Sequence, residues 1–235
     1  MPDLYQDIAL LSSAYLGPVQ YFTKFMIHPL QIIEGFDHYT KQTYRNRCHI
    51  MGANRILPLS IPVLKGQAHK TYVRDVRIDD RKKWQRLHWK SITSAYRRSP
   101  FFEFYMDEFA PYFERRFEFL FDFNAALLEV VLGDLDFEHN ILYTDHFIDS
   151  PAENCADYRE VVHPKRDLSA DPFFVPVPYQ QVFAERLGFG ANLSIIDLLF
   201  NEGPNARNVL EQCVASFPGN LHVSDQKRKP RVATK

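Results

Sequence analysis

The chain of 235 residues is predicted to have an α/β fold, with a mostly parallel sheet that opens strand–helix–strand and with helices from the middle of the chain onward. Short apolar runs at residues 8–13 and 30–36 are typical of buried strands. Between them, Pro18 suits the first turn of a helix, and apolar side chains then recur at helical spacing. That helix is expected to end at His28, because the residue before Pro29 is pushed out of the α region. This succession indicates a parallel β-α-β unit.

Four further segments are predicted to be strands. Residues 48–53 and 56–63 flank a short turn, and the prolines of the second segment place it at an edge or beside a bulge. Residues 72–79 alternate between two faces, as in a half-exposed strand. Residues 140–144 form the last expected strand, which ends just before Asp145.

Helical periodicity dominates the chain after residue 80. Asp80 is expected to cap a helix that runs to about Arg97. Its buried stripe is expected to include Trp84, Leu87 and His88. The later segments are a Phe-rich stretch over 101–121, a helix over 123–132 that stops at Gly133, a helix capped by Asn192 or Ser194 that stops at Gly203-Pro204, and a last helix to about Cys213.

The pattern of these segments divides the chain into four parts. Residues 1–147 are expected to form an α/β core. The Pro-rich stretch 148–178 carries little periodicity, and loops of this length are usually lids or linkers. Residues 179–222 are expected to pack on the core as a helical segment, and the basic tail 223–235 is expected to be disordered.

Composition restricts the class of protein. A formal net charge of −1 gives the chain no general attraction to nucleic acid or acidic membranes, so a nucleic-acid partner is not expected. The three cysteines are far apart and lack metal-ligand spacing, which argues against disulfides and thiolate zinc sites. The start of the chain resembles no signal peptide, and no apolar run approaches the roughly 20 residues that span a bilayer. These features predict a reduced, cytoplasmic protein without membrane insertion.

A polar stretch over residues 39–47 is the best candidate for a binding site. Ligands of parallel α/β sheets bind beyond the carboxyl ends of the strands, and this stretch follows the second strand. Cationic side chains there could bind phosphate or carboxylate, and neutral ones could add hydrogen bonds. The alternative is a solvated loop. The predicted substrate-binding residues are Lys41, Tyr44, Arg45, Asn46 and Arg47, together with Ser13 and Tyr15 after the first strand.

Three residues are candidates for proton transfer. His88 lies on the apolar stripe of its helix, where a histidine is more often a satisfied core residue than a general acid or base. Asp145 and His146 follow a strand and could reach the same edge of the sheet. Cys48 could be a nucleophile, although a buried strand cysteine is the more common case.

No cofactor or metal site is expected from motifs. The chain contains no GxGxxG motif, no Walker loop and no GxSxG motif. The motifs that usually indicate a dinucleotide site, a P-loop or the nucleophile elbow of a hydrolase are therefore absent from the sequence. The spacing of His49, His139, His146 and His163 matches no known metal-ligand pattern.

Several short segments together resemble the WbqC-like protein family over roughly residues 8–200. The resemblance implies an α/β protein found with surface-polysaccharide (O-antigen) assembly, with a transferase role. One departure is that many members have Gln-Pro-x-x-x-Pro at the end of the first strand, whereas here only the second proline, Pro18, matches. The role of that glutamine is therefore not carried over. The matching segments are Leu11 to Phe22, Tyr39 to Arg47, Leu59 to Val63, Val73 to Val76, Trp84 to Trp89, Tyr96 and Ser99 to Phe102.

These observations support two hypotheses. The first is a transferase acting on an anionic activated small molecule, such as a nucleotide-sugar or an acyl or aminoacyl donor, with His88 as the first candidate for proton transfer and Asp145 or His146 as the second. The second is a non-catalytic module that binds an anionic metabolite or a partner protein. Nucleic-acid binding through Arg86, Lys90 and the tail is a third reading, which the net charge disfavours.

Overall fold

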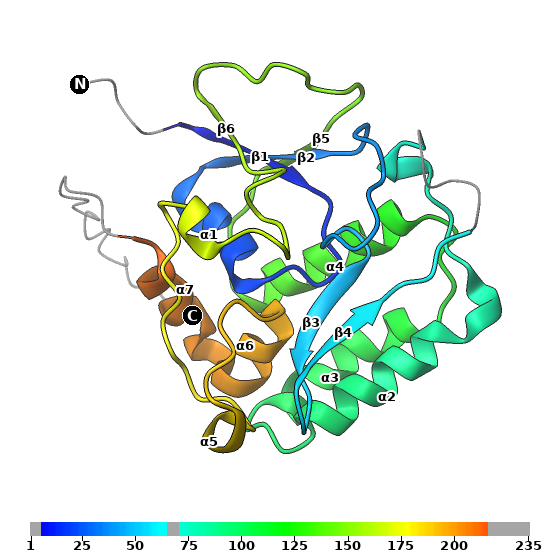
Figure 1. Ribbon diagram of the computed structural model, residues 1–235, viewed down its shortest axis with the longest axis vertical. Coiled ribbons are helices and arrows are strands. Elements are labelled where there is room, and N and C mark those ends of the chain that lie inside the picture. Colours follow the sequence, from blue (N-terminus) through cyan, green and yellow to red (C-terminus); the bar gives the residue numbers. More distant parts are fainter. Residues whose placement is uncertain (1–5, 65–70, 216–235) are drawn as a thin grey trace, which may run out of the picture.

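A four-stranded parallel sheet and a separate two-stranded hairpin organise the chain in a computed structural model that describes residues 6–64 and 71–215 (Figure 1). The parallel sheet has the order β5-β2-β1-β6, and β3 pairs with β4. The strands are β1 (Ile8–Ser12), β2 (Leu30–Glu34), β3 (Arg47–Met51), β4 (Ile56–Ser60), β5 (Ile141–Tyr143) and β6 (Cys155–Asp157). The helices are α1 (Val19–Ile27), α2 (Trp84–Tyr96), α3 (Phe102–Phe109), α4 (Leu120–Asp134), α5 (Ala184–Leu187), α6 (Ile195–Glu202) and α7 (Ala206–Cys213).

The predicted opening β-α-β unit is confirmed. β1 pairs with β2 in parallel, with Leu10 opposite Ile32, and α1 connects the two strands. Residues 9–11 are completely buried, which explains why this strand reads as a continuous apolar run. Figure 1 shows α1 and α4 on one side of the parallel sheet and the connection from β5 to β6 on the other. The predicted α/β class is therefore correct.

The β3–β4 hairpin is antiparallel and lies outside the parallel sheet. Cys48 lies opposite Leu59, both residues are buried, and β3 contacts α2 and α6. The two predicted strands are thus present, although each is shorter than its apolar pattern. Pro58 is accommodated because a two-stranded sheet leaves an outer edge without a pairing strand.

Three predictions around α2 are wrong. Residues 72–79 form no strand, because the chain curls into a 3-10 turn at Val73–Asp75 and makes only isolated bridges on either side. The cap before α2 is also displaced: the Asp79 side chain accepts a hydrogen bond from the Arg81 backbone N–H at 3.2 Å, and α2 begins only after a left-handed residue at Lys83. His88 is buried as expected, whereas Leu87 is 61% exposed.

Later elements follow the predictions more closely. The strand at β5 and the helices α6 and α7 are confirmed, with α6 ending at Gly203. α4 is longer than expected and contains Gly133 instead of stopping there. The stretch 148–178 contains β6, which pairs with β1, and carries the buried Asp171. Residues 216–235, which include the predicted tail, lie outside the described residues. No helix in the described ranges has the length and apolar character to cross a bilayer.

A buried carboxylate on α6 connects this helix to α2 and to the segment before α5. Asp197 is fully buried and accepts hydrogen bonds from the Tyr96 hydroxyl at 2.8 Å, the Tyr179 hydroxyl at 2.7 Å and the Gln181 amide at 2.8 Å. No cation pairs with it among the described residues. Burial raises the pKa of Asp197 to about 6, and the three donors limit the rise.

We expect Asp197 to make the stability of the protein depend on pH. Its pKa is higher in the folded chain than the ordinary aspartate value of 3.8, so its contribution is fully present below pH 4 and is lost as the pH rises through about 6. The free energy of unfolding of the wild type, relative to that of Asp197→Asn, should fall by about 2–3 kcal/mol between pH 4 and pH 7. Denaturant unfolding of both proteins across this range measures the difference. A difference that stays constant with pH would contradict the assignment.

Candidate functional site

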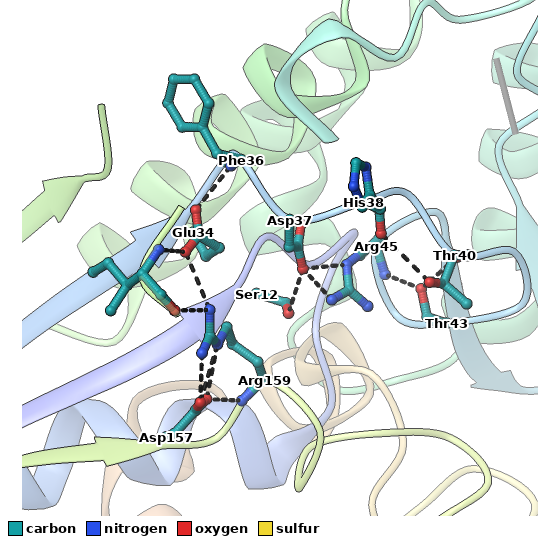
Figure 2. A network of polar contacts seen from close by, with 12 residues as sticks. Ser12, Glu34, Phe36, Asp37, His38, Thr40, Thr43, Arg45, Asp157 and Arg159 are labelled. Carbon is teal, nitrogen blue, oxygen red and sulfur yellow. Dashed lines mark hydrogen bonds and ion pairs between the residues drawn. The ribbon is translucent and has the colours of Figure 1, made fainter. Parts of the chain in front are cut away.

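A cavity of about 380 Å³ lies beyond the carboxyl ends of the parallel strands. This is the edge at which parallel α/β sheets usually bind ligands. Polar groups from the ends of β2 and β6 meet there with residues of the 39–47 stretch (Figure 2). The lining residues are Phe36, Asp37, His38, Thr40, Arg45, Tyr72, Phe147, Asp157, Arg159 and Glu160.

Arg159 forms one wall of the cavity and is fixed by two carboxylates. Its Nε and Nη2 donate to Asp157 at 3.0 Å and 2.6 Å, and its Nη1 donates to Glu34 Oε2 at 3.2 Å and to the Ile148 carbonyl at 2.8 Å. Glu34, at the end of β2, is fully buried and also accepts from the Thr144 hydroxyl at 2.8 Å. The guanidinium is therefore held rigidly where β2 and β6 end.

Arg45 forms a second ion pair at the same edge. Its Nε donates to Asp37 Oδ2 at 3.0 Å, its Nη2 donates to the same oxygen, and the Ser12 hydroxyl donates there at 3.5 Å. Burial raises the pKa of the Asp37 carboxyl, and the adjacent Arg45 limits the rise. Asp37 Oδ1 is buried without a hydrogen-bond partner in the described part of the chain. Within the same part, no hydrogen bond occupies Nη1 of Arg45, so this nitrogen could donate to a ligand.

The 39–47 stretch is anchored to the end of β1, which explains why Arg45 is well placed. The Asn124 amide of α4 donates both to the Ser13 hydroxyl at 3.0 Å and to the Arg45 carbonyl at 2.8 Å. The Tyr15 backbone N–H donates to the Tyr44 carbonyl at 2.8 Å. These bonds hold Arg45 at the carboxyl edge of the sheet, whereas Thr40, Lys41 and Gln42 are exposed.

Aromatic rings complete the cavity. Tyr72 stacks on His38 with ring centroids 5.4 Å apart and an angle of 5° between the planes. Its centroid lies 5.5 Å from that of Phe36, and its side chain is 41% exposed. Phe147 also lines the cavity, and the guanidinium carbon of Arg159 lies 5.1 Å from the centroid of its ring. These rings offer flat faces to a sugar or a base.

Among the predicted substrate-binding residues, Arg45 alone lines this cavity. Ser13 and Tyr44 line a much smaller hollow behind it, of about 10 Å³, which Arg45 also borders. The others lie elsewhere. Asn46 donates to the Ile61 carbonyl at 2.9 Å, Arg47 donates to the Ser60 hydroxyl at 2.8 Å, Tyr15 is buried in the core, and Lys41 is exposed.

The structure does not bring His88 to the cavity. Its Nδ1 lies 2.9 Å from the Tyr15 hydroxyl, and Trp84 packs against its ring. Burial lowers the pKa of His88 to about 4, so the imidazole is neutral at physiological pH. Cys48 is similarly buried, and burial raises the pKa of its thiol.

Asp145 and His146 lie nearer to the site. They follow β5, whose carboxyl end lies at the same edge of the sheet because β5 pairs with β2 in parallel. His146 Nδ1 lies 2.5 Å from Asp145 Oδ1, and both side chains are exposed. Neither lines the cavity, although the next residue, Phe147, does.

Sequence reasoning missed most of the acidic and aromatic lining. Asp157 ends β6, Arg159 and Glu160 follow it, and Tyr72 begins the stretch for which alternation predicts a strand. A signal existed in the alternating charges after the short run Cys155-Ala156, which is typical of a strand end. Among the described residues, no three His, Cys, Asp or Glu side chains are placed to hold a metal ion.

Comparisons with known proteins identify relatives over most of the chain. The sequence model of the WbqC-like protein family matches residues 13–176, a range that contains every residue lining the cavity. The chain is also 25% identical over 233 residues to "Uncharacterized protein Rv1507c" of Mycobacterium tuberculosis (strain ATCC 25618 / H37Rv), a match that covers 88% of this chain and 99% of that protein. No solved structure matches the chain significantly.

Proposed function

The chain belongs to the WbqC-like protein family, and from this premise we propose that it binds an anionic activated small molecule in the cavity at the carboxyl edge of the sheet. The reaction class would be transfer from a nucleotide-sugar, acyl or aminoacyl donor in surface-polysaccharide assembly. One observation carries the proposal: Arg45 and Arg159, each fixed by a buried carboxylate, line the same cavity. Two pre-positioned guanidinium groups are suited to a phosphate or carboxylate.

The charges of the lining narrow the ligand class. Asp37, Asp157 and Glu160 line the cavity beside the two arginines, so its carboxylates outnumber its guanidinium groups. A bare anion would meet as much repulsion as attraction there. A ligand that also presents hydroxyl or ammonium groups would satisfy the carboxylates. Activated sugars and aminoacyl donors have this mixed character, and the rings of Tyr72 and Phe147 could stack on a sugar or base.

Proton transfer in this proposal is assigned to the Asp145–His146 pair. His146 is exposed, its Nδ1 contacts a carboxylate, and it precedes a residue that lines the cavity. A carboxylate beside an imidazole orients the ring. His88 is not part of the proposed mechanism, because it is buried in the core and does not line the cavity.

A non-catalytic binding module is the second candidate function. The observation that favours it is that two acidic and two basic groups of the lining neutralise one another: Asp37 pairs with Arg45, and Asp157 pairs with Arg159. Groups committed to ion pairs are poor general acids and bases. Stabilisation by a ligand without turnover would favour this reading.

We expect Tyr72→Ala to weaken ligand binding without unfolding the protein. A thermal-shift screen of the wild type against nucleotide-sugars, acyl-CoAs and free nucleotides identifies the ligand, because binding raises Tm. The affinity should then fall about tenfold in Tyr72→Ala, since loss of a stacked ring costs roughly 1–3 kcal/mol. Tyr143→Ala is the matched control, because Tyr143 is similarly exposed and does not line this cavity. Equal losses in both variants, or none in Tyr72→Ala, would contradict the proposed site.

Substitution of Arg45 needs a conservative variant. Arg45→Ala would leave Asp37 buried and unpaired, so a loss of binding could reflect a loss of folding. Arg45→Lys retains the charge but removes the guanidinium fork. We expect it to weaken binding of the anionic ligand while the Tm without ligand changes little.

A further inference from the structure

A second hollow, of about 850 Å³, lies far from the parallel sheet. Its walls come from the end of α2, the turn between β3 and β4, and the segment around α5. Figure 1 shows this turn and α5 at the lower edge of the molecule, with the parallel sheet along the upper edge. The lining residues are Ala53, Lys90, Thr93, Ser94, Ala95, Arg97, Arg98, Val182, Phe183, Glu185 and Arg186.

The hollow concentrates positive charge. Lys90, Arg97, Arg98 and Arg186 line it, opposed by the single carboxylate of Glu185. None of these four cations forms a salt bridge within residues 6–64 and 71–215. The whole chain, by contrast, carries a formal net charge of −1. The positive charge is therefore local and, in contrast to the charges of the sheet cavity, largely uncompensated.

Stabilisation of a helix end explains the position of only some of these four cations. Arg97 and Arg98 follow the last residue of α2, where positive charge suits the partial negative charge of the helix carbonyls. Lys90 lies in the middle of that helix and does not benefit in this way, and Arg186 lies in α5, a helix of only four residues. Four like charges around one hollow repel one another, and a bound anion would relieve that repulsion.

We propose that this hollow is a second binding site, specific for the diphosphate group of a small molecule. The cations could share two adjacent phosphates, and the hydroxyls of Thr93 and Ser94 could donate hydrogen bonds to them. Phe183 on the opposite wall presents a ring that could stack on a nucleobase. The same chemistry is offered by free pyrophosphate and by nucleoside diphosphates. The site is independent of the function proposed for the sheet cavity.

Calorimetric titration of the full chain with ADP, UDP, inorganic pyrophosphate and adenosine tests the proposal. The three diphosphates should bind and adenosine should not, and the affinity should fall as salt is added. Arg97→Glu combined with Arg186→Glu should weaken binding about 100-fold or more, because two charge-assisted contacts are replaced by repulsion. Lys82→Glu combined with Arg86→Glu is the matched control, since both residues are exposed near the start of α2 and neither lines the hollow.

Two further variants identify the ligand and the site. If the natural ligand is a nucleoside diphosphate, Phe183→Ala should weaken the binding of ADP and UDP but not that of pyrophosphate. If wild type and Phe183→Ala bind all three compounds with equal affinity, the natural ligand is free pyrophosphate. Tyr72→Ala should leave diphosphate binding here unchanged, so failure at the sheet cavity and failure here are distinguishable. Three results would each overturn the proposal. They are the absence of diphosphate binding at low salt, an equal loss of affinity in the control variant, and binding of a single-stranded oligonucleotide without any binding of diphosphates.

Discussion

Replacing Lys24 by methionine is expected to lower the free energy of unfolding by about 3–5 kcal/mol. The ammonium of Lys24 on α1 lies 2.6 Å from Asp171 Oδ2, and neither side chain is exposed at all. It also lies 4.7 Å from the centroid of the Tyr158 ring. Methionine retains the volume and removes the charge, so the Asp171 carboxylate would remain buried with only hydrogen bonds to Gln20 and the backbone. Breaking a buried pair is costly for this reason.

Thermal and denaturant unfolding measure this effect, which should appear as a fall in Tm of roughly 10 °C. Lys41→Met is the matched control, because Lys41 is exposed and its replacement should change stability by less than about 0.5 kcal/mol. Lys24→Met combined with Asp171→Asn should recover part of the loss, because the unpaired charge is removed as well. A loss in Lys24→Met no larger than that of the control would show that the pair contributes nothing to stability.

The second large effect is expected for Arg159→Met. This substitution would leave Glu34 without a cation at the end of β2, where it is fully buried, and it would release the Ile148 carbonyl. We expect a loss of about 3–5 kcal/mol in the free energy of unfolding. Because Arg159 is also a wall of the sheet cavity, ligand binding should be lost as well. Unfolding experiments and the thermal-shift assay measure the two effects separately.

Arg81→Met is the control for this substitution. Arg81 pairs with Asp79, two residues earlier, at 2.7 Å and 2.9 Å, which is the same spacing as between Arg159 and Asp157. Its guanidinium is exposed, however, and it contacts no second carboxylate among the described residues. Asp79 is buried, but it keeps the hydrogen bond from the backbone N–H of residue 81 when the side chain is replaced. Its replacement should therefore have a much smaller effect. Similar losses in the two variants would mean that the local pair, and not the contact with Glu34, is responsible.

The edge of the sheet that carries the candidate site could be predicted because it depends on local patterns. The apolar runs of β1 and β2 and the helix between them specify a parallel pair, and this pairing places Ser12 near Asp37. The position of Arg45 at this edge could be predicted by the same reasoning. Spacing alone could not show which arginine of the stretch reaches the cavity. Arg47 begins β3 and donates to Ser60, whereas Arg45 donates to Asp37.

The remainder of the site depends on contacts that are remote in sequence. β6 has only three residues and no periodicity, and it is a strand because β1 offers it a partner. The Tyr72 ring lines the cavity because the chain turns at Val73–Asp75, whereas alternation of residue types predicted an extended strand. Histidine is the residue type most often used as a general base, but tertiary packing buries His88. Alternation and residue type alone cannot reveal these outcomes.

The pairing of β6 with β1 also has a consequence for how the chain folds. Residues 8–10 pair with residues 155–157, Lys24 meets Asp171, and the Val19 backbone N–H donates to the Leu193 carbonyl. The first strand and helix therefore lack these partners until segments well over a hundred residues later have been synthesised. Contacts of such long range slow folding and leave early segments exposed meanwhile. We expect the nascent N-terminal third to depend on chaperones until the final segments emerge.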